Sequence, residues 1–462
     1  RAEVVRRRGW LNAQMLLAAQ LLAVAMRSTI IETGGSVGWG YKEITPLIYL
    51  QTQAGVLVHY LRLAFCPHPL CLDYAWRPAA TPAAIYLPGA AILALLAGSL
   101  FAFLYRPWLG FLGLSFFLVL APTSSIIPIR DMAVEHRMYL PLAPVVVLAV
   151  FGWYALTERA VRDPAARRLA RVGPAALAVL LLAALTLQRN LDYGDPLRMW
   201  SKVVAVAPHN ARGHFSRGAT LAMRGDPQGA IACFERALAL EPNYARAHGN
   251  LGILLLGQGE WDRGEEHLRR AIELKPDYAT ALVSLGNAAA RQLRWRQAAH
   301  YYRQALSSEP YHVQARQNLA AALLQMERNA EAVAILRETV RLNPHAVDVR
   351  VQLAWILATH PDDRLRDGGE AVRLAEQARA QAGDAYWPAW DALAAAYAEL
   401  GRFDEAAQAA RRCLERARGA GLGGRLGEFQ TRLARYQNGQ PFRDTESTVP
   451  DSQAGGIDND ES

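Results

Sequence analysis

The sequence lacks the local motifs that mark several large classes of enzymes and metal-binding proteins. Its 462 residues contain no GxxxxGK(S/T) loop, no HExxH motif and no CxxC pair. P-loop nucleotide hydrolases, zinc peptidases and CxxC-type metal or redox sites are therefore without sequence support. The 11 histidines are scattered without the spacing of metal ligands. We predict no metal site and no cofactor, and we assign no residue a catalytic role.

Charge is absent or sparse in five apolar runs of the first 190 residues, although the mean hydropathy of the whole chain is only +0.01. The runs cover residues 11–25, 83–105, 108–122, 139–156 and 173–187. A bilayer core about 30 Å thick needs roughly 20 helical residues, so we predict a transmembrane domain at residues 1–190 with about five spans. Core helices of a soluble domain are the disfavoured alternative, because residues 83–104 contain no charged side chain.

Arginines flank these runs in a pattern that predicts their orientation. They lie before the first run, between the second and third, and between the fourth and fifth: Arg6, Arg7, Arg8, Arg106, Arg159, Arg162, Arg167, Arg168 and Arg171. Loops rich in Lys and Arg stay in the cytoplasm, so these sites all face inward only if residues 46–66 do not cross. Residues 46–66 carry several polar side chains, and we predict that they form an interfacial amphipathic helix.

This topology places everything after the last run outside the cytoplasm. We predict an integral membrane protein, in a bacterium an inner-membrane protein with its carboxy-terminal half in the periplasm; in a eukaryote that side would be the ER lumen. The formal net charge of +8 and the pI near 9.4 come largely from arginines that flank the apolar runs. No RNP, zinc-finger or helix-turn-helix motif accompanies the charge, so we predict no nucleic-acid partner.

Cysteine is scarce, with four residues in the chain. Cys66 and Cys71 share a predicted extracytoplasmic loop, where a disulfide is chemically permitted, but the spacing does not fix its geometry and the pairing stays open. Cys233 and Cys413 fall at helical positions that small buried residues usually fill.

Prolines recur every 34 residues in the second half of the chain: Pro208, Pro242, Pro276, Pro310 and Pro344. Glycine or alanine recurs at 218, 252, 286 and 320 and again at 230, 264, 298 and 332, and large residues follow at 234, 268, 302 and 336. Small residues let two helices approach, and proline ends the second helix because its ring cannot continue the hydrogen-bond ladder. The pattern resembles the tetratricopeptide repeat (TPR), a hairpin of helices A and B. We therefore predict an all-α protein, a multi-span transmembrane helical domain followed by a TPR α-solenoid.

The predicted TPR array covers residues 211–420 and has six repeats. A half repeat at residues 191–210 leads into it. Four full repeats occupy residues 211–244, 245–278, 279–312 and 313–346, and the fifth carries an insertion at residues 360–369. A capping helix is predicted at residues 421–444, because solenoids need a polar cap for solubility. The acidic, Ser- and Gly-rich tail at residues 445–462 lacks periodicity and is predicted to be disordered.

Helix A of each TPR lines a concave groove that usually holds a peptide or a partner helix. Positions 2, 5, 9 and 12 of each repeat are the predicted groove positions. Asn250, Asn287 and Asn318 lie at or near this face, where their amides could clamp a peptide backbone. The alternative is that they are solvated helix A side chains without a ligand.

A polar loop at residues 121–144 interrupts the apolar runs. It reads Pro122-Thr123-Ser124-Ser125-Ile126-Ile127-Pro128 and then Glu135-His136-Arg137-Met138-Tyr139-Leu140-Pro141. With Tyr60-Leu61-Arg62-Leu63, Pro67-His68, Leu72-Asp73-Tyr74 and the array that follows, the chain resembles the carboxy-terminal part of the transmembrane-and-TPR-containing proteins. These are O-mannosyltransferases of the glycosyltransferase C superfamily, and the similar region covers nearly the whole chain.

The resemblance implies transfer of a sugar from a polyprenyl phosphate to a protein hydroxyl outside the cytoplasm. Glu135, His136 and Arg137 are candidates for lipid-phosphate binding, since a guanidinium matches phosphate oxygens; the alternative is that they anchor a helix end among lipid headgroups. In that superfamily the catalytic acid lies in the first extracytoplasmic loop, which would precede residue 1. The chain therefore looks like part of a longer protein, and neither Glu32 nor Asp73 is given the catalytic role.

Two hypotheses follow for function. In the first, the chain is part of a polyprenyl-phosphate-sugar-dependent glycosyltransferase whose TPR array binds a protein partner or acceptor. In the second, it is a non-enzymatic, membrane-anchored TPR scaffold for envelope assembly. Membrane lipids are partners in both. A transporter is disfavoured because the apolar runs lack the buried charges and broken helices of a substrate path.

Overall fold

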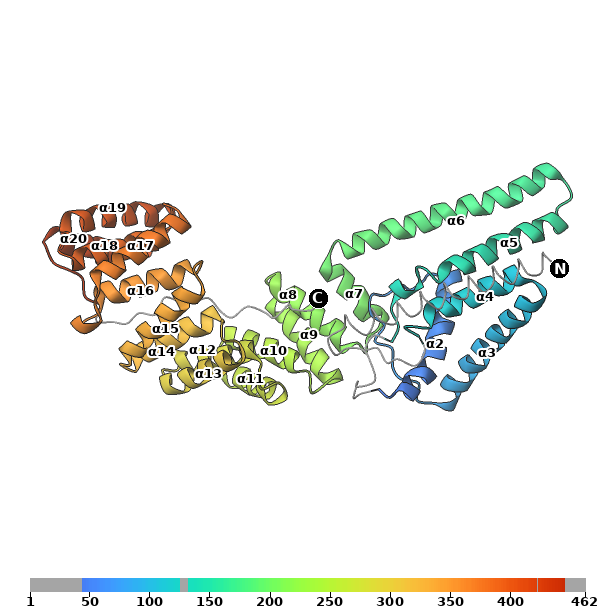
Figure 1. The fold of residues 1–462 in the computed structure, drawn as a ribbon, viewed down its shortest axis with the longest axis horizontal. Helices are drawn as coiled ribbons and strands as arrows, with labels where there is room; N and C mark the ends of the chain where they lie inside the picture. Colours follow the sequence, from blue (N-terminus) through green and yellow to red (C-terminus); the bar gives the residue numbers. More distant parts are fainter. Residues whose placement is uncertain (1–43, 125–131, 422, 445–462) are drawn as a thin grey trace, which may run out of the picture. The chain divides into compact units, whose positions relative to one another are not determined.

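A computed structural model describes residues 44–124, 132–421 and 423–444, which form helices and connecting turns without a β-strand. The chain divides into two compact units, residues 1–221 and residues 222–462 (Figure 1). The all-α prediction is confirmed for the described residues. The predicted run at 11–25 and the predicted disordered tail at 445–462 both lie outside them.

The first unit contains seven described α-helices and one short 3₁₀ helix. Several of the α-helices begin with Thr or Asp as N-cap followed by proline, as at Thr45 and Asp195, because such a side chain caps free N–H groups and proline needs none. The elements are α2 (Pro46–Phe65), α3 (Pro82–Tyr105), α4 (Pro107–Leu120), η1 (Glu135–Met138), α5 (Leu142–Ala160), α6 (Pro164–Tyr193), α7 (Pro196–Val206) and α8 (Ala211–Met223).

Three described helices, α3, α5 and α6, are long and apolar enough to cross a membrane. Five spans were predicted, and the run at 108–122 is the one that the described structure corrects. It forms α4, which has 14 residues and is therefore about 21 Å long, shorter than a bilayer core of about 30 Å. The helix begins at Pro107, directly after Arg106, and the chain turns at Ala121.

Small residues bring α3 and α4 close together. A Cβ atom added at Gly110 would lie 2.2 Å from the backbone N of Phe103, and one added at Gly113 would lie 2.3 Å from Ser99 Oγ. Close backbone approach of this kind is how apolar helices associate without a hydrophobic driving force between them.

Helix α2 matches the predicted helix at residues 46–66 within one residue. Its buried side chains recur every three or four residues: Tyr49, Thr52, Gln53, Val56, Leu57, Tyr60 and Leu63. The Tyr60 hydroxyl donates to Val134 O at 2.9 Å and accepts from Val134 N at 2.8 Å, and Gln53 Nε2 donates to Met132 O at 3.2 Å. The buried face of α2 is thus fixed to residues 132–134, and whether its other face meets lipid headgroups stays a prediction.

The second unit is a run of helical hairpins in which successive helices pack against each other (Figure 1). Its helices are α9 (Pro227–Leu240), α10 (Ala245–Gly257), α11 (Trp261–Leu274), α12 (Ala279–Arg291), α13 (Trp295–Ser308), α14 (Val313–Gln325), α15 (Asn329–Leu342), α16 (Val347–Thr359), η2 (Asp363–Leu365), α17 (Gly368–Ala382), α18 (Trp387–Glu399), α19 (Phe403–Gly419), η3 (Gly423–Arg425) and α20 (Leu426–Gln437).

The small residues of the 34-residue pattern lie where helix A meets helix B. A Cβ added at Gly252 would lie 2.7 Å from Leu268 Cγ, and one added at Gly286 would lie 2.4 Å from Tyr302 Cε1. The large residues of the pattern fill the space beside them, since Leu268 is 0% and Tyr302 2% exposed. This is the packing that the sequence pattern predicts.

The array departs from strict repetition at its two ends. Helices α7 and α8, which the sequence places in the half repeat and the first full repeat, fall in the first unit up to Leu221. The insertion at 360–369 contains η2 and the first residues of α17. Helix α20 lies inside the predicted capping region at 421–444, and its residues Phe429 and Tyr436 are buried in the core of the last repeats.

Candidate peptide-binding face

Asn287 and Asn318, two of the three predicted groove residues, are hydrogen-bonded to each other across neighbouring repeats. Asn318 Nδ2 donates to Asn287 Oδ1 at 2.7 Å, and the hydroxyl of Tyr302 donates to the same oxygen at 2.8 Å. Gln314 Nε2 in turn donates to Asn318 Oδ1 at 2.8 Å. Helices α12, α13 and α14 are therefore joined by one chain of side-chain hydrogen bonds.

This chain of hydrogen bonds fixes the orientation of the Asn287 amide. Two donors hold its oxygen, so its Nδ2 points away from them, and no hydrogen bond of that nitrogen is found among the described residues. Asn287 is half-buried, whereas Asn318 is only 7% exposed. Asn287 is thus the member of the pair that is available to an extended ligand, and Asn318 is its positioning residue.

Asn250, the third predicted groove residue, is 0% exposed in α10. Its side chain lies in the interior of the hairpin stack and not on an open face. Near Asn287, the half-buried polar side chains of Thr280 and Gln314 occupy helix A position 2 of their repeats. We define the helix A face as Thr280, Asn287, Gln314 and Asn318.

Glu265 joins consecutive repeats from the helix B side, and the sequence pattern gave no indication of it. Its side chain is 9% exposed and is paired with Arg269 and with Arg294, the latter at 2.5 Å, while Gln292 Nε2 donates to it at 2.8 Å. Arg294 and Gln292 lie in the turn after α12. They follow Glu265 by 29 and 27 residues, which is less than the 34-residue period of the repeats. A buried carboxylate with this many partners holds α11 against the next turn.

Of the predicted lipid-phosphate trio, only the Arg137 side chain lies in the described structure. Glu135 and His136 belong to η1, but their side chains lie outside the described parts. Arg137 is half-buried, and its Nη1 donates to Met132 O at 3.2 Å and to Thr123 O at 3.5 Å. The hydroxyl of Tyr49 donates to the same Thr123 O at 2.6 Å. Burial raises the pKa of Tyr49 to about 12.

Asp73 connects the loop after α2 to the helices that lead into the array. Arg212 Nε donates to Asp73 Oδ2 at 2.9 Å, and Asn210 Nδ2 donates to the Asp73 carbonyl at 3.1 Å. Asp73 is 7% exposed and Asn210 2%. This anchor ties the start of α8 to the loop after α2 within the first unit.

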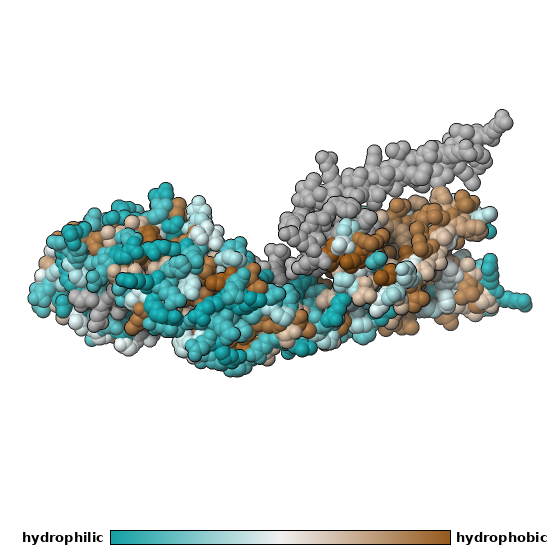
Figure 2. Space-filling model, turned by 90° about the horizontal axis from the view of Figure 1, so that it is seen from below, coloured by the Kyte–Doolittle hydropathy of each residue, from teal (hydrophilic) through white to brown (hydrophobic). Residues whose placement is uncertain are grey.

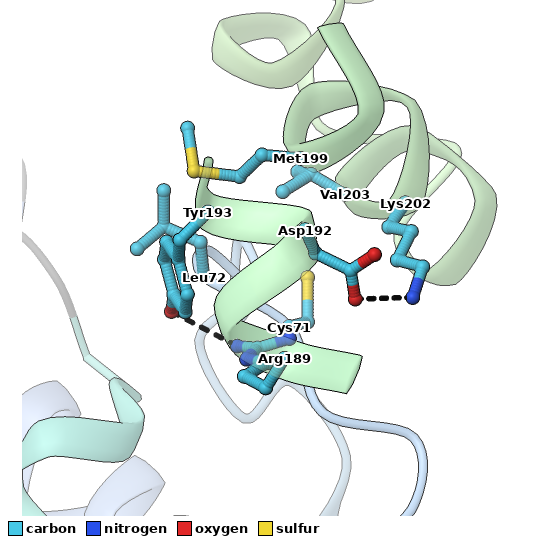
Figure 3. Close-up of a pocket in the computed structure, with 8 residues that line it drawn as sticks. All are labelled: Cys71, Leu72, Arg189, Asp192, Tyr193, Met199, Lys202 and Val203. Atoms are coloured by element: carbon cyan, nitrogen blue, oxygen red, sulfur yellow. Dashed lines mark hydrogen bonds and ion pairs between the residues drawn. The ribbon is translucent and has the colours of Figure 1, made fainter. Parts of the chain in front are cut away.

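A small cavity lies beside this anchor (Figure 3). It is lined by residues of the loop after α2, the end of α6 and α7, among which Lys202 pairs with Asp192 and Arg189 Nη2 donates to the Tyr193 hydroxyl at 3.0 Å. Its volume of about 10 Å³ suffices for roughly one water molecule. Cys71 at its wall and the exposed Cys66 are both free thiols, so the open question of a disulfide is answered in the negative in this structure.

Comparison with protein families matches tetratricopeptide repeats at residues 221–287 and 289–356, with further tetratricopeptide matches at residues 181–245 and 388–419. The chain contains tetratricopeptide repeats. The matches cover both ends of the predicted array and reach into α6, and no part of them concerns a glycosyltransferase. The TPR prediction is therefore confirmed, and the O-mannosyltransferase resemblance stays a prediction.

Several solved structures are similar to parts of this chain. Pseudomonas aeruginosa pilF is 21% identical, covering 48% of this chain and 96% of its own, with a TM-score of 0.41. A MamA protein is 24% identical, covering 34% and 86%, with a TM-score of 0.31. YrrB, described as a TPR protein with an unusual peptide-binding site, is 21% identical, covering 40% and 91%, with a TM-score of 0.34. Comparison with curated protein sequences gives no match.

Proposed function

We propose that this chain is a membrane-anchored TPR protein whose helix A face binds an extended segment of a partner protein outside the cytoplasm. The observation that carries the proposal is the Asn287 amide, whose oxygen is held by Tyr302 and Asn318 while its nitrogen remains to donate to a peptide carbonyl. An amide fixed in advance loses little rotamer freedom on binding. The stacked repeats supply the extended surface on which such contacts recur.

Selection of peptides on the purified full chain tests this proposal. A displayed library of random dodecapeptides is selected in detergent, and the bound sequences are titrated by fluorescence anisotropy against the chain and against Asn287→Ala. Loss of one hydrogen bond at a partly buried site costs about 1 kcal/mol, so affinity is expected to fall about fivefold. Asn318→Ala is expected to have a similar effect because Asn287 then loses the donor that orients it.

Asn243→Ala is the matched control. Asn243 is exposed in the turn between α9 and α10 and accepts from Arg270 Nη2 at 2.9 Å, away from the helix A face. Its replacement is expected to leave peptide affinity unchanged. Equal affinities for the chain, Asn287→Ala and Asn318→Ala would place the peptides elsewhere and remove this face from the proposal.

A second candidate function is transfer of a sugar from a lipid phosphate, as the resemblance implies. One arrangement favours it: the two segments that carry the resemblance pack together, with the Tyr60 hydroxyl bonded to Val134 and Gln53 bonded to Met132. Against a direct phosphate contact, Arg137 already donates to two carbonyl groups. Binding of a polyprenyl phosphate in detergent to the chain and to Arg137→Ala tests it, and equal binding by the two would remove Arg137 from the site.

A further inference from the structure

After α20 the chain returns to helices that lie far earlier in the sequence. Gly439, at φ +68°, turns the backbone, and Gln440 N donates to Arg435 O at 2.9 Å. Residues 441–444, which we call the tail segment, are then non-helical and half-buried against α16 and α18, helices that lie beside α20 at one end of the second unit (Figure 1). Segments this far apart in sequence meet here through specific contacts.

Asp444 makes the contact with α16. Its backbone N donates to Thr359 O at 2.9 Å, and its Oδ2 accepts from Trp355 Nε1 at 2.8 Å. Trp355 occupies position 9 of its repeat, the position that Asn287 occupies two repeats earlier. Asp444 therefore lies on the helix A side of the array, and it is held by one main-chain and one side-chain bond.

Phe442 supplies an apolar anchor beside these bonds. Its ring centroid lies 5.7 Å from that of Trp355, and the guanidinium carbon of Arg432 lies 5.5 Å from the Phe442 ring. Arg432 also lies over the rings of Trp355 and Phe429, and Asp391 accepts from its Nη2 at 3.0 Å. The site for Phe442 is built by α16 and α20 even before the tail segment is considered.

Arg443 forms an ion pair with Glu399. Its Nη2 lies 2.6 Å from Glu399 Oε2 at the end of α18, and Arg366 Nε donates to Glu399 Oε1 at 2.8 Å. Arg366 comes from the insertion at 360–369, where its Nη1 donates to the carbonyls of His360 and Pro361. The insertion that breaks the repeat period thus holds one wall of the site for the tail segment.

We propose that Trp355, Thr359, Glu399 and Arg432 form a peptide site, and that the tail segment is an internal ligand which occupies it until a partner displaces it. The partner would present the same kinds of residue as the tail segment, in an extended peptide with an aromatic residue followed by a basic and an acidic one. This inference rests on the proposed function in that the array binds extended peptides, but it concerns a different pair of helices. Side-chain contacts of Phe442, Arg443 and Asp444 and one main-chain bond, all within a half-buried non-helical segment of four residues, are the features of peptide recognition and not of a closed core.

Occupancy by a tethered ligand has a quantitative consequence. A short linker keeps an internal segment at an effective concentration on the order of millimolar, so a free peptide with the same contacts competes poorly. Loosening the tail segment should therefore expose a site of measurable affinity for a free copy of that segment.

The test is a titration with a labelled peptide of the sequence of residues 440–445, QPFRDT, followed by fluorescence anisotropy. Three chains are compared in detergent: the full chain, a chain ending at Asn438, and the full chain with Phe442→Ala and Asp444→Asn. The two loosened chains are expected to bind the peptide at least about tenfold more tightly than the full chain does. A peptide with the Phe442→Ala change should bind none of them, and Trp355→Phe in the shortened chain should weaken binding about fivefold because it removes the indole donor.

Three results of this titration would overturn the proposal that the tail segment is an exchangeable internal ligand. Absence of peptide binding by the loosened chains, with melting curves like that of the full chain, would show a fixed cap and overturn the proposal. Equal binding by the full and loosened chains would overturn occupancy of the site. Unfolding of both loosened chains would also overturn it, because an exchangeable ligand is not required for folding. Library peptides that depend on Asn287 should be insensitive to Trp355→Phe, so this inference and the proposed function can fail separately.

Discussion

The two units bury their apolar side chains in opposite ways. Helix α3 has 24 residues and none of them is buried, whereas α12 has 13 residues and nine of them are. Among the described residues of the second unit, the large exposed apolar side chains are Met223, Leu293, Tyr311 and Leu400, while α3 to α6 expose leucines, phenylalanines and tyrosines along most of their length. Figure 2 shows the same contrast, with hydrophobic residues gathered over the first unit and hydrophilic ones over the second.

This difference indicates which surroundings, water or lipid, suit the exposed side chains of each set of helices. Helices of the second unit satisfy their apolar faces by stacking on the next repeat, and their polar faces carry charge pairs such as Arg337 with Glu370 across neighbouring repeats. Helices α3, α5 and α6 pack on neighbouring helices, as α3 does on α4, yet most of their apolar side chains stay exposed. We expect an apolar exterior of this extent to be stable in lipid and not in water.

The largest effect is expected from the same truncation made in each unit. Leu268 in α11 is 0% exposed and Leu180 in α6 is 68% exposed. Leu268→Ala removes buried contacts and leaves a cavity, which costs about 2–5 kcal/mol, while Leu180→Ala is expected to stay within about 0.5 kcal/mol. Thermal unfolding of the full chain in detergent measures both. A large loss at Leu180 would mean that α6 packs on protein and would erase the comparison.

Next comes a charge placed on an exposed leucine of each unit. Leu93 near the middle of α3 is 66% exposed, and Leu293 in the turn after α12 is 72% exposed. If α3 lies in lipid, Leu93→Arg costs about 3 kcal/mol of insertion free energy, whereas Leu293→Arg meets water and is nearly neutral. Insertion of residues 82–105 is scored by glycosylation sites placed on either side of the helix. Undiminished insertion with Arg at 93 would argue that α3 does not cross.

A smaller effect is expected from adding a methyl group at helical glycines. At Gly286 the new Cβ would lie 2.4 Å from the ring of the buried Tyr302, and overpacking of this kind costs about 1–3 kcal/mol. At Gly98 in α3 nothing lies within 4 Å, so Gly98→Ala should be neutral or stabilise by up to about 1 kcal/mol through helix propensity. Denaturant midpoints compare the two. Destabilisation by both would show that the Gly98 position of α3 also has a close neighbour.

The sequence predicted those parts of the fold that local sterics control. The proline period and the small residues at 252 and 286 predicted the helical hairpins correctly. Close helix contact and helix ends depend on residues within one repeat, so they can be read from the sequence. Asn287 and Asn318 were both placed at or near the helix A face, but they are 31 residues apart and not one period, and their mutual hydrogen bond was not foreseen. Helix α4 was overestimated because apolar composition alone does not show that Pro107 and the turn at Ala121 limit its length.

The contacts that escaped prediction join residues far apart in the sequence. Asp73 and Arg212 are 139 residues apart, and no spacing rule connects a loop after α2 to the first helix of the array. Trp355 and Asp444 are 89 residues apart and meet because the insertion and the capping helix bring the chain back. Such contacts depend on tertiary geometry, so the unit boundary at Leu221 and the tail segment were visible only in the structure.

The smallest effect is expected from pH. Burial lowers the pKa of His59 in the first unit to about 4, and two histidines of the second unit add to the loss of stability in acid. His248 and His267 meet through their Nδ1 atoms at 2.9 Å, and His248 Nε2 lies 3.0 Å from Pro242 O. Burial lowers the pKa of both histidines, and each imidazole is held neutral in the fold. Above the unfolded value of about 6.5 both states are neutral and the stabilisation is complete. As pH falls through that value the unfolded chain takes up protons first, so stability is lost.

His267→Asn is expected to flatten this acid-side loss, because one of the two half-buried imidazoles is then absent. His300→Asn in α13, whose ring lies 6.0 Å from that of Tyr301, serves as the matched control and should leave the slope of stability against pH unchanged. Melting temperatures of the full chain between pH 5 and 8 provide the measurement. An unchanged slope in His267→Asn would show that acid sensitivity arises elsewhere. A slope that changes equally in both variants would mean that surface histidines, and not the close packing of the hairpins, set the pH response.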